Sequence, residues 1–123
     1  MMSDLFGTER APASPTVVGP ATAPVVRVEA SVGDGPPRQF LGRVAWALHE
    51  LVHAGDSGCT PITHPGPRWS DYVFKLRRDG VLVETVTETH GGAFSGHHAR
   101  YKLASRVRLV TVVRGEKRGR GRA

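Results

Sequence analysis

The sequence predicts an α+β domain in which two helices precede a β-hairpin and a further strand. Two observations indicate this fold class. Apolar residues recur at helical spacing in residues 39–54 and again in residues 67–79. Runs rich in β-branched residues follow at residues 81–88 and 107–113, with a glycine-rich stretch between them. Helices in one part of the chain and strands in another are typical of the α+β class.

The N-terminal part, residues 1–37, is expected to be mostly disordered. Four prolines interrupt Ala, Thr and Ser in residues 1–24, with no apolar period. The stretch VVRVEA, Val25 to Ala30, is compatible with a short edge strand, which GDGPP would end. The folded domain is therefore predicted to span residues 38–113, and residues 114–123 are expected to form a flexible basic tail.

Residues 39–54 are predicted to form an amphipathic helix that ends near Gly55. A turn and then a short extended segment, CTPI, are expected next, because Pro61 and Pro65 oppose a helix there. The apolar stripe of the helix consists of Phe40, Leu41, Val44, Leu48, Leu51 and Val52.

A second helix is predicted over residues 67–79. Pro67 suits the first helical position, where its missing N–H costs nothing, and Gly80 suits a left-handed C-cap. Trp69, Val73 and Leu76 form one apolar face, with Tyr72 beside it. The opposite face presents Ser70, Asp71, Phe74, Lys75 and Arg78.

Two strands joined by a glycine-rich loop are expected after the second helix. VLVETVTE (81–88) alternates as a strand does, THGGAFSGHH (89–98) is a hairpin loop with three glycines, and ARYKLAS (99–105) returns as a strand. The last strand, VRLVTVV (107–113), is expected to pair either with Val25–Ala30 or with a second copy of the chain.

Helix, short extended segment, helix, strand, loop and strand is the order of a winged helix. Helix 67–79 would then be the recognition helix, and the loop 89–98 the wing. An intact helix-turn-helix would carry another short helix within residues 57–66. The prolines and glycines of that segment leave room for at most a single turn.

The segment WSDYVFKLRRDGVLVET, Trp69 to Thr85, resembles the small winged-helix (helix-turn-helix) domains common among phage and prophage proteins of bacteria. Their junction tends to read Ser-x-x-(Ile/Val)-x-x-Leu-Arg-x-x-Gly, then a strand that ends Ile/Val-Glu-Thr. Tyr72 stands where members often carry Arg. The resemblance covers roughly residues 40–104 and implies DNA binding. The matching residues are Ser70, Val73, Leu76, Arg77, Gly80, Val83, Glu84 and Thr85, followed by Arg100, Tyr101 and Leu103 of RYKL.

The second helix and the glycine-rich loop carry the chemistry of a DNA-binding surface. A helix in the major groove reads base edges with polar side chains, while cationic side chains contact phosphates. A flexible loop can enter the minor groove or lie along the backbone. The expected DNA contacts are Arg68, Ser70, Asp71, Phe74, Lys75 and Arg78 on the helix, His97, His98, Arg100 and Lys102 on the wing, and Arg118, Arg120 and Arg122 in the tail.

Charge is distributed unevenly along the chain. Residues 1–37 hold two basic and four acidic residues, a net charge of −2, whereas residues 38–123 hold fifteen basic and seven acidic ones, a net charge of +8. Such a surplus attracts polyanions, although it is also compatible with a merely solvated basic surface. A single cysteine, no signal-peptide pattern and no membrane-spanning apolar run favour a cytoplasmic, nucleoid-associated location.

The pentapeptide HELVH, His49 to His53, matches the zinc signature of metallopeptidases. The longer pattern His-Glu-x-x-His-x-x-Gly-x-x-His fails, because Asp56 stands at its glycine and Cys59 at its third histidine. We therefore predict a non-enzymatic protein without metal or cofactor. Two alternatives stay open: a zinc peptidase, and a non-catalytic metal site formed by His49, His53 and Cys59.

Taken with its charge, the expected fold predicts a small regulator of transcription, or a phage-type accessory factor, that binds double-stranded DNA. A homodimer is expected, because one short module reads few base pairs, and strand 107–113 is the candidate dimer element. The main alternative is a winged helix that binds another protein, which an exposed Phe74 would favour. The charge alone does not distinguish DNA from RNA.

Overall fold

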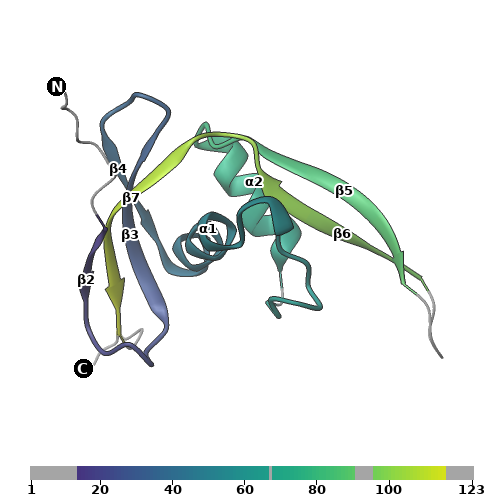
Figure 1. The fold of residues 1–123 in the computed structure, drawn as a ribbon, viewed down its shortest axis with the longest axis horizontal. Helices are drawn as coiled ribbons and strands as arrows, with labels where there is room; N and C mark the ends of the chain where they lie inside the picture. Colours follow the sequence, from purple (N-terminus) through teal and green to yellow (C-terminus); the bar gives the residue numbers. More distant parts are fainter. Residues whose placement is uncertain (1–13, 67, 91–95, 116–123) are drawn as a thin grey trace, which may run out of the picture.

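The computed structural model describes residues 14–66, 68–90 and 96–115, and Figure 1 shows how they fold. A four-stranded sheet lies at one end, a two-stranded hairpin projects at the other, and the helices lie between them. The elements are β2 (Thr16–Val18), β3 (Val25–Val32), β4 (Pro37–Leu41), α1 (Gly42–Ala54), the short 3-10 helix η1 (Gly55–Ser57), α2 (Trp69–Arg78), β5 (Val83–His90), β6 (Gly96–Leu103) and β7 (Val107–Arg114).

The four-stranded sheet has the order β2-β7-β3-β4. β3 is antiparallel to both β4 and β7, and β2 runs parallel to β7. The register places Val112, Val28 and Phe40 side by side across three strands, and all three side chains are buried. They belong to the same core as Leu48 and Leu51 of α1, so α1 covers this face of the sheet.

The N-terminal part of the structure differs from the prediction of disorder over residues 1–37. β2 and β3 both lie in that segment, and Val25, Val28 and Ala30 are buried. The predicted edge position of Val25–Ala30 is also wrong, because β3 is hydrogen-bonded on both sides. The prediction failed because it treated prolines as a sign of disorder, although Pro15, Pro20 and Pro24 each stand just outside a strand and leave β2 and β3 uninterrupted. Residues 1–13 lie outside the described residues.

The first helix begins later than predicted. Gln39, Phe40 and Leu41 belong to β4 and pair with β3, and the helix starts at Gly42. Phe40 is buried from the strand, whereas Leu41 is 58% exposed instead of lying in the helical stripe. The spacing of apolar residues could not distinguish a helix from a strand at residues 39–41. Residues 40, 44 and 48 suit one face of a helix, but β3 provides a backbone partner for residues 37–41. The predicted end near Gly55 is confirmed.

A single turn connects η1 to α2, as predicted for residues 57–66. The His64 amide donates to the Thr60 carbonyl at 2.9 Å, and Thr60 Oγ1 accepts from the amide of Thr63 at 2.9 Å. Of the predicted extended segment CTPI only Cys59 is extended, where it exchanges two backbone hydrogen bonds of 2.8 Å with Tyr101, and Pro61 and Ile62 belong to the turn. A Cβ on Gly58 would lie 2.6 Å from the Tyr101 carbonyl oxygen, so this close approach requires glycine.

The second helix and the hairpin follow the predicted order. α2 lies within the predicted range 67–79, and Gly80 follows it with a φ of 92°, as expected of a left-handed cap. Both strands are shifted toward the loop: β5 runs from Val83 to His90 and β6 from Gly96 to Leu103, so the loop is shorter than residues 89–98. Residue 67 and the loop residues 91–95 lie outside the described residues.

The last strand, β7, was expected to pair either with Val25–Ala30 or with a second copy of the chain. β7 pairs with β3 on one side and with β2 on the other, so the expected pairing with Val25–Ala30 is confirmed. On its other edge β7 is paired with β2 only at Thr111–Val113, so the expected role of this strand in a dimer stays a prediction.

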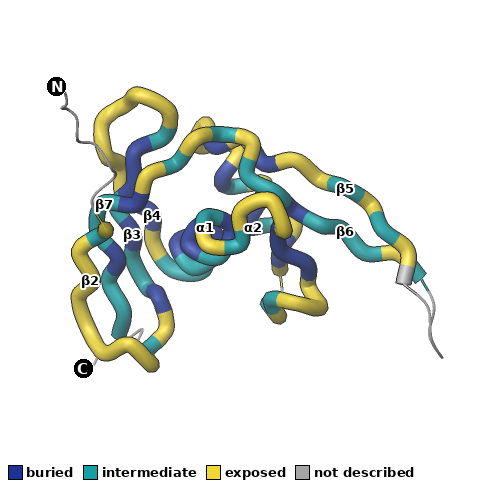
Figure 2. The backbone as a smooth tube through the Cα atoms, in the orientation of Figure 1, coloured by how far each residue is buried: buried dark blue, intermediate teal, exposed yellow. Residues whose placement is uncertain are grey.

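The core lies where α1 meets the sheet and α2 (Figure 2). An aromatic cluster joins α1, α2 and β6: the Trp69 ring centroid lies 5.4 Å from that of Trp46 and 5.7 Å from that of Tyr101. Trp69 Nε1 also donates to the His64 carbonyl at 2.6 Å. α2 is therefore held rigidly on one side, and its other side is free to act as a surface.

Candidate nucleic-acid interface

The outward side of α2 is the first part of the candidate interface. Trp69, Val73 and Leu76 are buried as predicted, and Tyr72 is buried with them. The Tyr72 hydroxyl accepts from Arg43 Nε at 3.4 Å, so Tyr72 is a core residue that does not face a ligand. Ser70, Phe74 and Arg78 are exposed, and Phe74 is 62% exposed.

The charges on this side of α2 partly neutralise one another. Lys75 Nζ lies 3.1 Å from Asp71 Oδ2, in an i,i+4 pair whose side chains stay partly exposed. Such exposed pairs contribute little to stability and exchange readily for other partners. Arg68 precedes the first turn of α2 and Arg78 ends the helix, and both are exposed. The outward side therefore offers cations at both ends and an exposed phenyl ring between them.

Arg77 does not belong to the outward side. Its guanidinium donates to the Val83 carbonyl at 2.7 Å through Nη2 and at 3.2 Å through Nε, and Nη2 also donates to Thr85 Oγ1 at 2.8 Å. These bonds hold the end of α2 against β5. Arg77 therefore serves the edge of the core.

The wing strands carry a small ion-pair network. Glu88 Oε2 accepts from Arg100 Nε at 2.6 Å, and Glu88 Oε1 lies 3.2 Å from His98 Nε2. The hydrogen bond from Arg100 lowers the pKa of the Glu88 carboxyl. Arg100 Nη1 also donates to the Ser57 carbonyl at 2.6 Å, so it ties the hairpin to η1.

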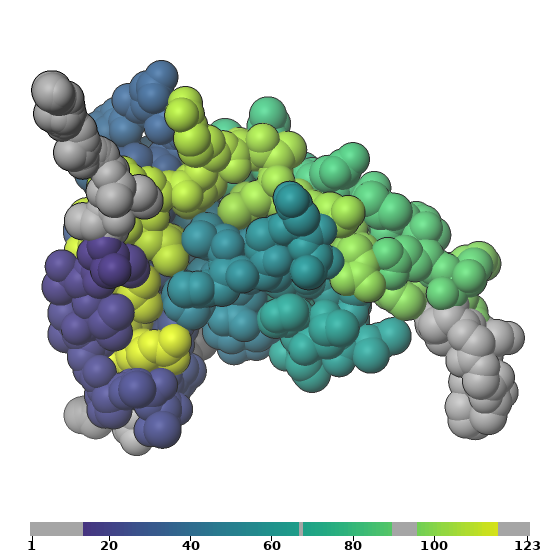
Figure 3. All heavy atoms as spheres, viewed as in Figure 1, coloured from purple at the N-terminus to yellow at the C-terminus, as the bar shows by residue number. Residues whose placement is uncertain are grey.

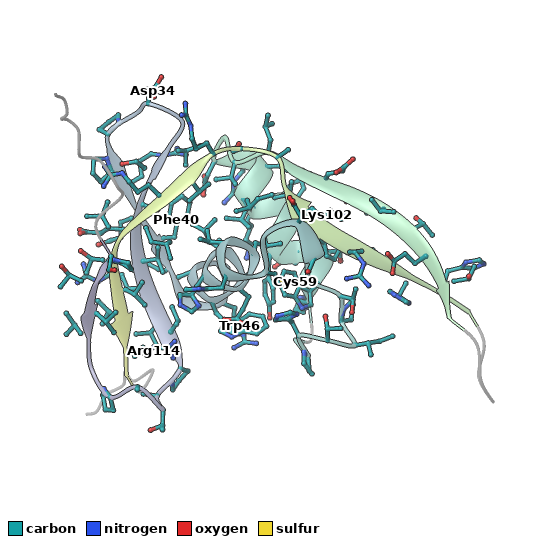
Figure 4. All side chains as sticks on the ribbon, viewed as in Figure 1. Asp34, Phe40, Trp46, Cys59, Lys102 and Arg114 are labelled. Atoms are coloured by element: carbon teal, nitrogen blue, oxygen red, sulfur yellow. The ribbon has the colours of Figure 1, made fainter. Side chains whose placement is uncertain are left out.

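The structure thus separates the predicted wing contacts into two groups. Arg100 and His98 are engaged inside the hairpin, whereas His97 is exposed and Lys102 is half-buried on β6, opposite Glu84 (Figure 4). Glu88, which organises the network, was not among the predicted site residues. The hairpin register, with Glu88 opposite His98, was the signal that could have identified it. Arg118, Arg120 and Arg122 lie outside the described residues.

HELVH lies on the second half of α1 and holds α1 to the turn before α2. His49 is buried, and its Nδ1 lies 2.9 Å from Glu50 Oε2, while Glu50 Oε1 lies 3.9 Å from His64 Nε2. Burial is the main cause that lowers the pKa of His49. The His49 and His53 rings are in contact, with centroids 4.2 Å apart and planes tilted by 56°.

A metal site at HELVH would need a third ligand beside the two histidines. Cys59 is fully buried, and burial raises the pKa of its thiol to about 12, which disfavours the thiolate that binds metal. In residues 14–66, 68–90 and 96–115, no group of three or more His, Cys, Asp or Glu side chains could hold a metal ion. The carboxylate of Glu50 faces its neighbouring histidines instead of an open cleft.

A groove of about 430 Å³ lies between the end of α1 and β7. Val52, Val107 and Leu109 contribute apolar side chains, and His53, Arg106 and Arg108 contribute the charged or titratable ones. Ser14 and Pro15 complete the lining of the groove among the described residues.

The described helices are too short or too polar to cross a membrane. Comparison with known proteins gives one match: a family model described as a winged helix domain matches residues 37–113, which is more than half of the chain. The matched range begins with β4 and ends within β7, so it contains both helices and the wing but leaves out β2 and β3. No curated protein and no solved structure matches.

Proposed function

The chain belongs to the winged helix domain family, and on that premise we propose that it is a non-enzymatic protein that binds double-stranded DNA. The observation that carries the proposal is the two-sided character of α2. One side is fixed in the core by Trp69, Tyr72 and Leu76, and the other presents Arg68 and Arg78 around Ser70 and Phe74. A helix held in this way can enter a major groove without losing its packing.

In the proposed complex, α2 provides base contacts and its cations provide phosphate contacts. Ser70 and Asp71 can form hydrogen bonds with base edges, and Phe74 can contact a thymine methyl group. Arg68 and Arg78 are placed to contact phosphates on the two sides of the groove, and Lys75 can exchange Asp71 for a phosphate. The excess of basic residues in 38–123 supplies a sequence-independent attraction.

The hairpin is proposed to contact the DNA backbone beside the groove that α2 enters. In Figure 3 the β5–β6 hairpin projects from the body of the molecule, as a wing must in order to reach DNA. His97 and Lys102 are the proposed contacts on its strands. His98 and Arg100 act chiefly by holding the hairpin against Glu88 and Ser57. Arg118, Arg120 and Arg122 are proposed to add non-specific affinity.

The experiment that tests this proposal replaces Lys75 and Arg78 with alanine and measures binding to a mixed duplex DNA pool at several salt concentrations. We expect weaker binding, and a log–log salt dependence whose slope falls by about 2, one for each lost phosphate contact. Arg108→Ala is the matched control, because Arg108 is an exposed cation on β7. Unchanged binding by the double variant, or an equal loss in the control, would contradict the role of α2.

A second candidate function is binding to another protein through α2. The specific observation in its favour is Phe74, which is 62% exposed in the middle of the outward side. The two functions respond differently to the same variants. A protein partner would be lost in Phe74→Ala and retained in the Lys75 and Arg78 double variant, whereas DNA binding would show its larger loss in the double variant.

At a finer level, we propose a small regulator of transcription or an accessory factor of bacterial or phage type, located in the cytoplasm at the nucleoid. Selection of bound sequences from the duplex pool tests whether the protein is a regulator that recognises particular DNA sequences. Enrichment of particular sequences is expected of a regulator, and uniform retention of all sequences would instead indicate a non-specific DNA-coating protein.

A further inference from the structure

The four-stranded sheet has a second face, which points away from α1. Because side chains alternate along a strand, the residues on either side of the buried row Val112, Val28 and Phe40 point outward. The register places Val113, Arg27 and Leu41 in one outward row and Thr111, Glu29 and Gln39 in the next. We refer to these six residues as the outer face.

The outer face is accessible. Leu41 is 58% exposed, and the Arg27 and Glu29 side chains are 40% and 41% exposed. Val18 of β2 extends the first row beside Val113 and is 50% exposed. Within the described part of the chain, α1 packs on the opposite face, and Figure 1 shows the sheet at one end of the molecule. The outer face therefore combines exposed aliphatic side chains with one cation and one anion.

The edges of this sheet are poorly suited to pairing with another strand. β2 has only three residues and lies between Pro15 and Pro20, and β4 begins at Pro37 after Pro36. Proline has no N–H to donate, and short strands flanked by proline resist the addition of a strand. β7 is paired with β3 along its length, and β2 pairs with its other side at Thr111–Val113. Association of this sheet with a partner would therefore use its outer face.

The charges of the outer face are complementary to the same face of a second copy. Arg27 and Glu29 stand two residues apart on β3, with Arg27 Nη1 4.0 Å from Glu29 Oε2. A two-fold axis that crosses the strands level with Val28 places Arg27 opposite the partner's Glu29, and Glu29 opposite the partner's Arg27. Contacts that occur twice in this way are the mark of an isologous interface.

We propose that the outer face is a homodimer interface in which the sheets of two chains pack face to face and exchange two Arg27–Glu29 ion pairs. The aliphatic side chains of Val18, Val113 and Leu41 lie around the charges and are covered at the same time. This inference is independent of DNA binding, since the dimer forms through a sheet that does not include α2 or the wing.

The test uses charge reversal and analytical ultracentrifugation of the full chain without DNA. The wild-type chain is expected to dimerise with a concentration-dependent sedimentation coefficient. Arg27→Glu and Glu29→Arg should each weaken the dimer by on the order of tenfold or more, because each places like charges opposite each other twice. Arg78→Glu is the matched control, since it reverses one exposed charge on α2 and should leave the dimer unchanged.

Mixing the two single variants gives the decisive result. R27E carries two carboxylates on the outer face and E29R carries two guanidinium groups, so a heterodimer of the two is fully complementary. We expect the mixture, and the double variant R27E/E29R, to regain dimer; this recovery would also show that the single variants are folded. A wild-type chain that stays monomeric, single variants that dimerise normally, or a mixture that does not recover would each overturn the proposal.

Discussion

Arg77 and Thr85 lie eight residues apart in the sequence, and the Arg77 guanidinium donates a hydrogen bond of 2.8 Å to the Thr85 hydroxyl. Arg77 stands in the last turn of α2, and its donors reach the Val83 carbonyl and Thr85 Oγ1 on β5. The Leu-Arg-x-x-Gly pattern followed by Val-Glu-Thr therefore has a physical basis: the arginine fixes the angle between a helix and the strand after it. The neighbouring Arg78 makes no such bond in the described structure and points outward.

The contrast between these two arginines gives a prediction. Arg77→Ala should lower the free energy of unfolding by about 1 kcal/mol, since it removes hydrogen bonds from a charged donor at a partly exposed site. Arg78→Ala should leave that free energy nearly unchanged and weaken DNA binding instead. Urea unfolding of both variants measures the difference. Equal stability of the two variants would mean that Arg77 does not brace β5.

His49 makes the stability of the fold depend on pH. Burial holds the pKa of folded His49 below its ordinary value of 6.5, so the folded chain favours the neutral ring. Below pH 6.5 the unfolded chain takes up a proton that the folded chain takes up only at lower pH. The free energy of unfolding should therefore fall as the pH drops below 6.5.

The measurement compares the free energy of unfolding above pH 6.5 with the free energy of unfolding below pH 6.5. His49→Gln should show a smaller difference between neutral and mildly acidic pH than the wild-type chain, whatever its absolute stability. His97→Gln is the control, because the His97 side chain is exposed on β6 and is not in contact with His49. A pH difference that is the same in His49→Gln and in the wild-type chain would show that another group is responsible.

At the scale of the elements, the end of α2 depends on a glycine. Gly80 has a φ of 92°, and its amide donates to the Arg77 carbonyl at 3.0 Å. Gly80→Ala should lower the free energy of unfolding by about 1 kcal/mol through backbone strain alone, because the nearest atom to an added Cβ is Arg38 Nη2 at an ordinary 3.6 Å. Gly115→Ala, with nothing near its added Cβ, should have little effect in the same unfolding experiment.

Local signals predicted the elements from α2 onward well. The apolar face of α2, the left-handed position of Gly80 and the β-branched runs before and after the wing each depend on residues close together in the chain. The boundary between β4 and α1 could not be predicted in this way. Phe40 satisfies both a helical spacing and a buried strand position, and the partner that decides between them, Val28, lies twelve residues away.

In the candidate site, too, some features can be predicted from neighbouring residues in the sequence, and others depend on residues far away in the chain. The outward position of Phe74 and the inward positions of Trp69 and Leu76 follow from helical spacing alone. The roles of Tyr72 and Arg100 do not, because each is fixed by a distant partner: Arg43 for the Tyr72 hydroxyl, and the Ser57 carbonyl for Arg100. No pattern within a single helix or strand contains those contacts.

At the scale of the whole molecule, the winged helix is combined with a sheet that reaches beyond it. The family match begins at residue 37, yet β3 lies between β4 and β7, and its Val25, Val28 and Ala30 are buried in the common core. The N-terminal strands are therefore part of the same folding unit as the wing and the helices.

This arrangement predicts the effect of shortening the chain. Residues 36–123, without β2 and β3, should lose the cooperative thermal transition, because β7 loses both of its partner strands and β4 loses β3, its partner in the described sheet. Residues 14–123 should keep the transition. Circular dichroism during heating distinguishes the two. Cooperative unfolding of residues 36–123 at the wild-type temperature would show that β3 is an accessory to the domain.

The pairing of β3 with β7 also has a consequence for the order of events during synthesis. Glu29 leaves the ribosome early, but its partner Thr111 is among the last of the described residues to appear. Both helices and the hairpin can assemble from local contacts while one side of β3 is still unpaired. Closing the sheet then requires the two ends of the nascent chain to meet, which is the most costly loop closure in this fold. Until β7 is released, the backbone hydrogen-bonding groups along that side of β3 are unpaired and accessible to other chains. A nascent chain is therefore most prone to pair with the wrong strand at this stage of its synthesis.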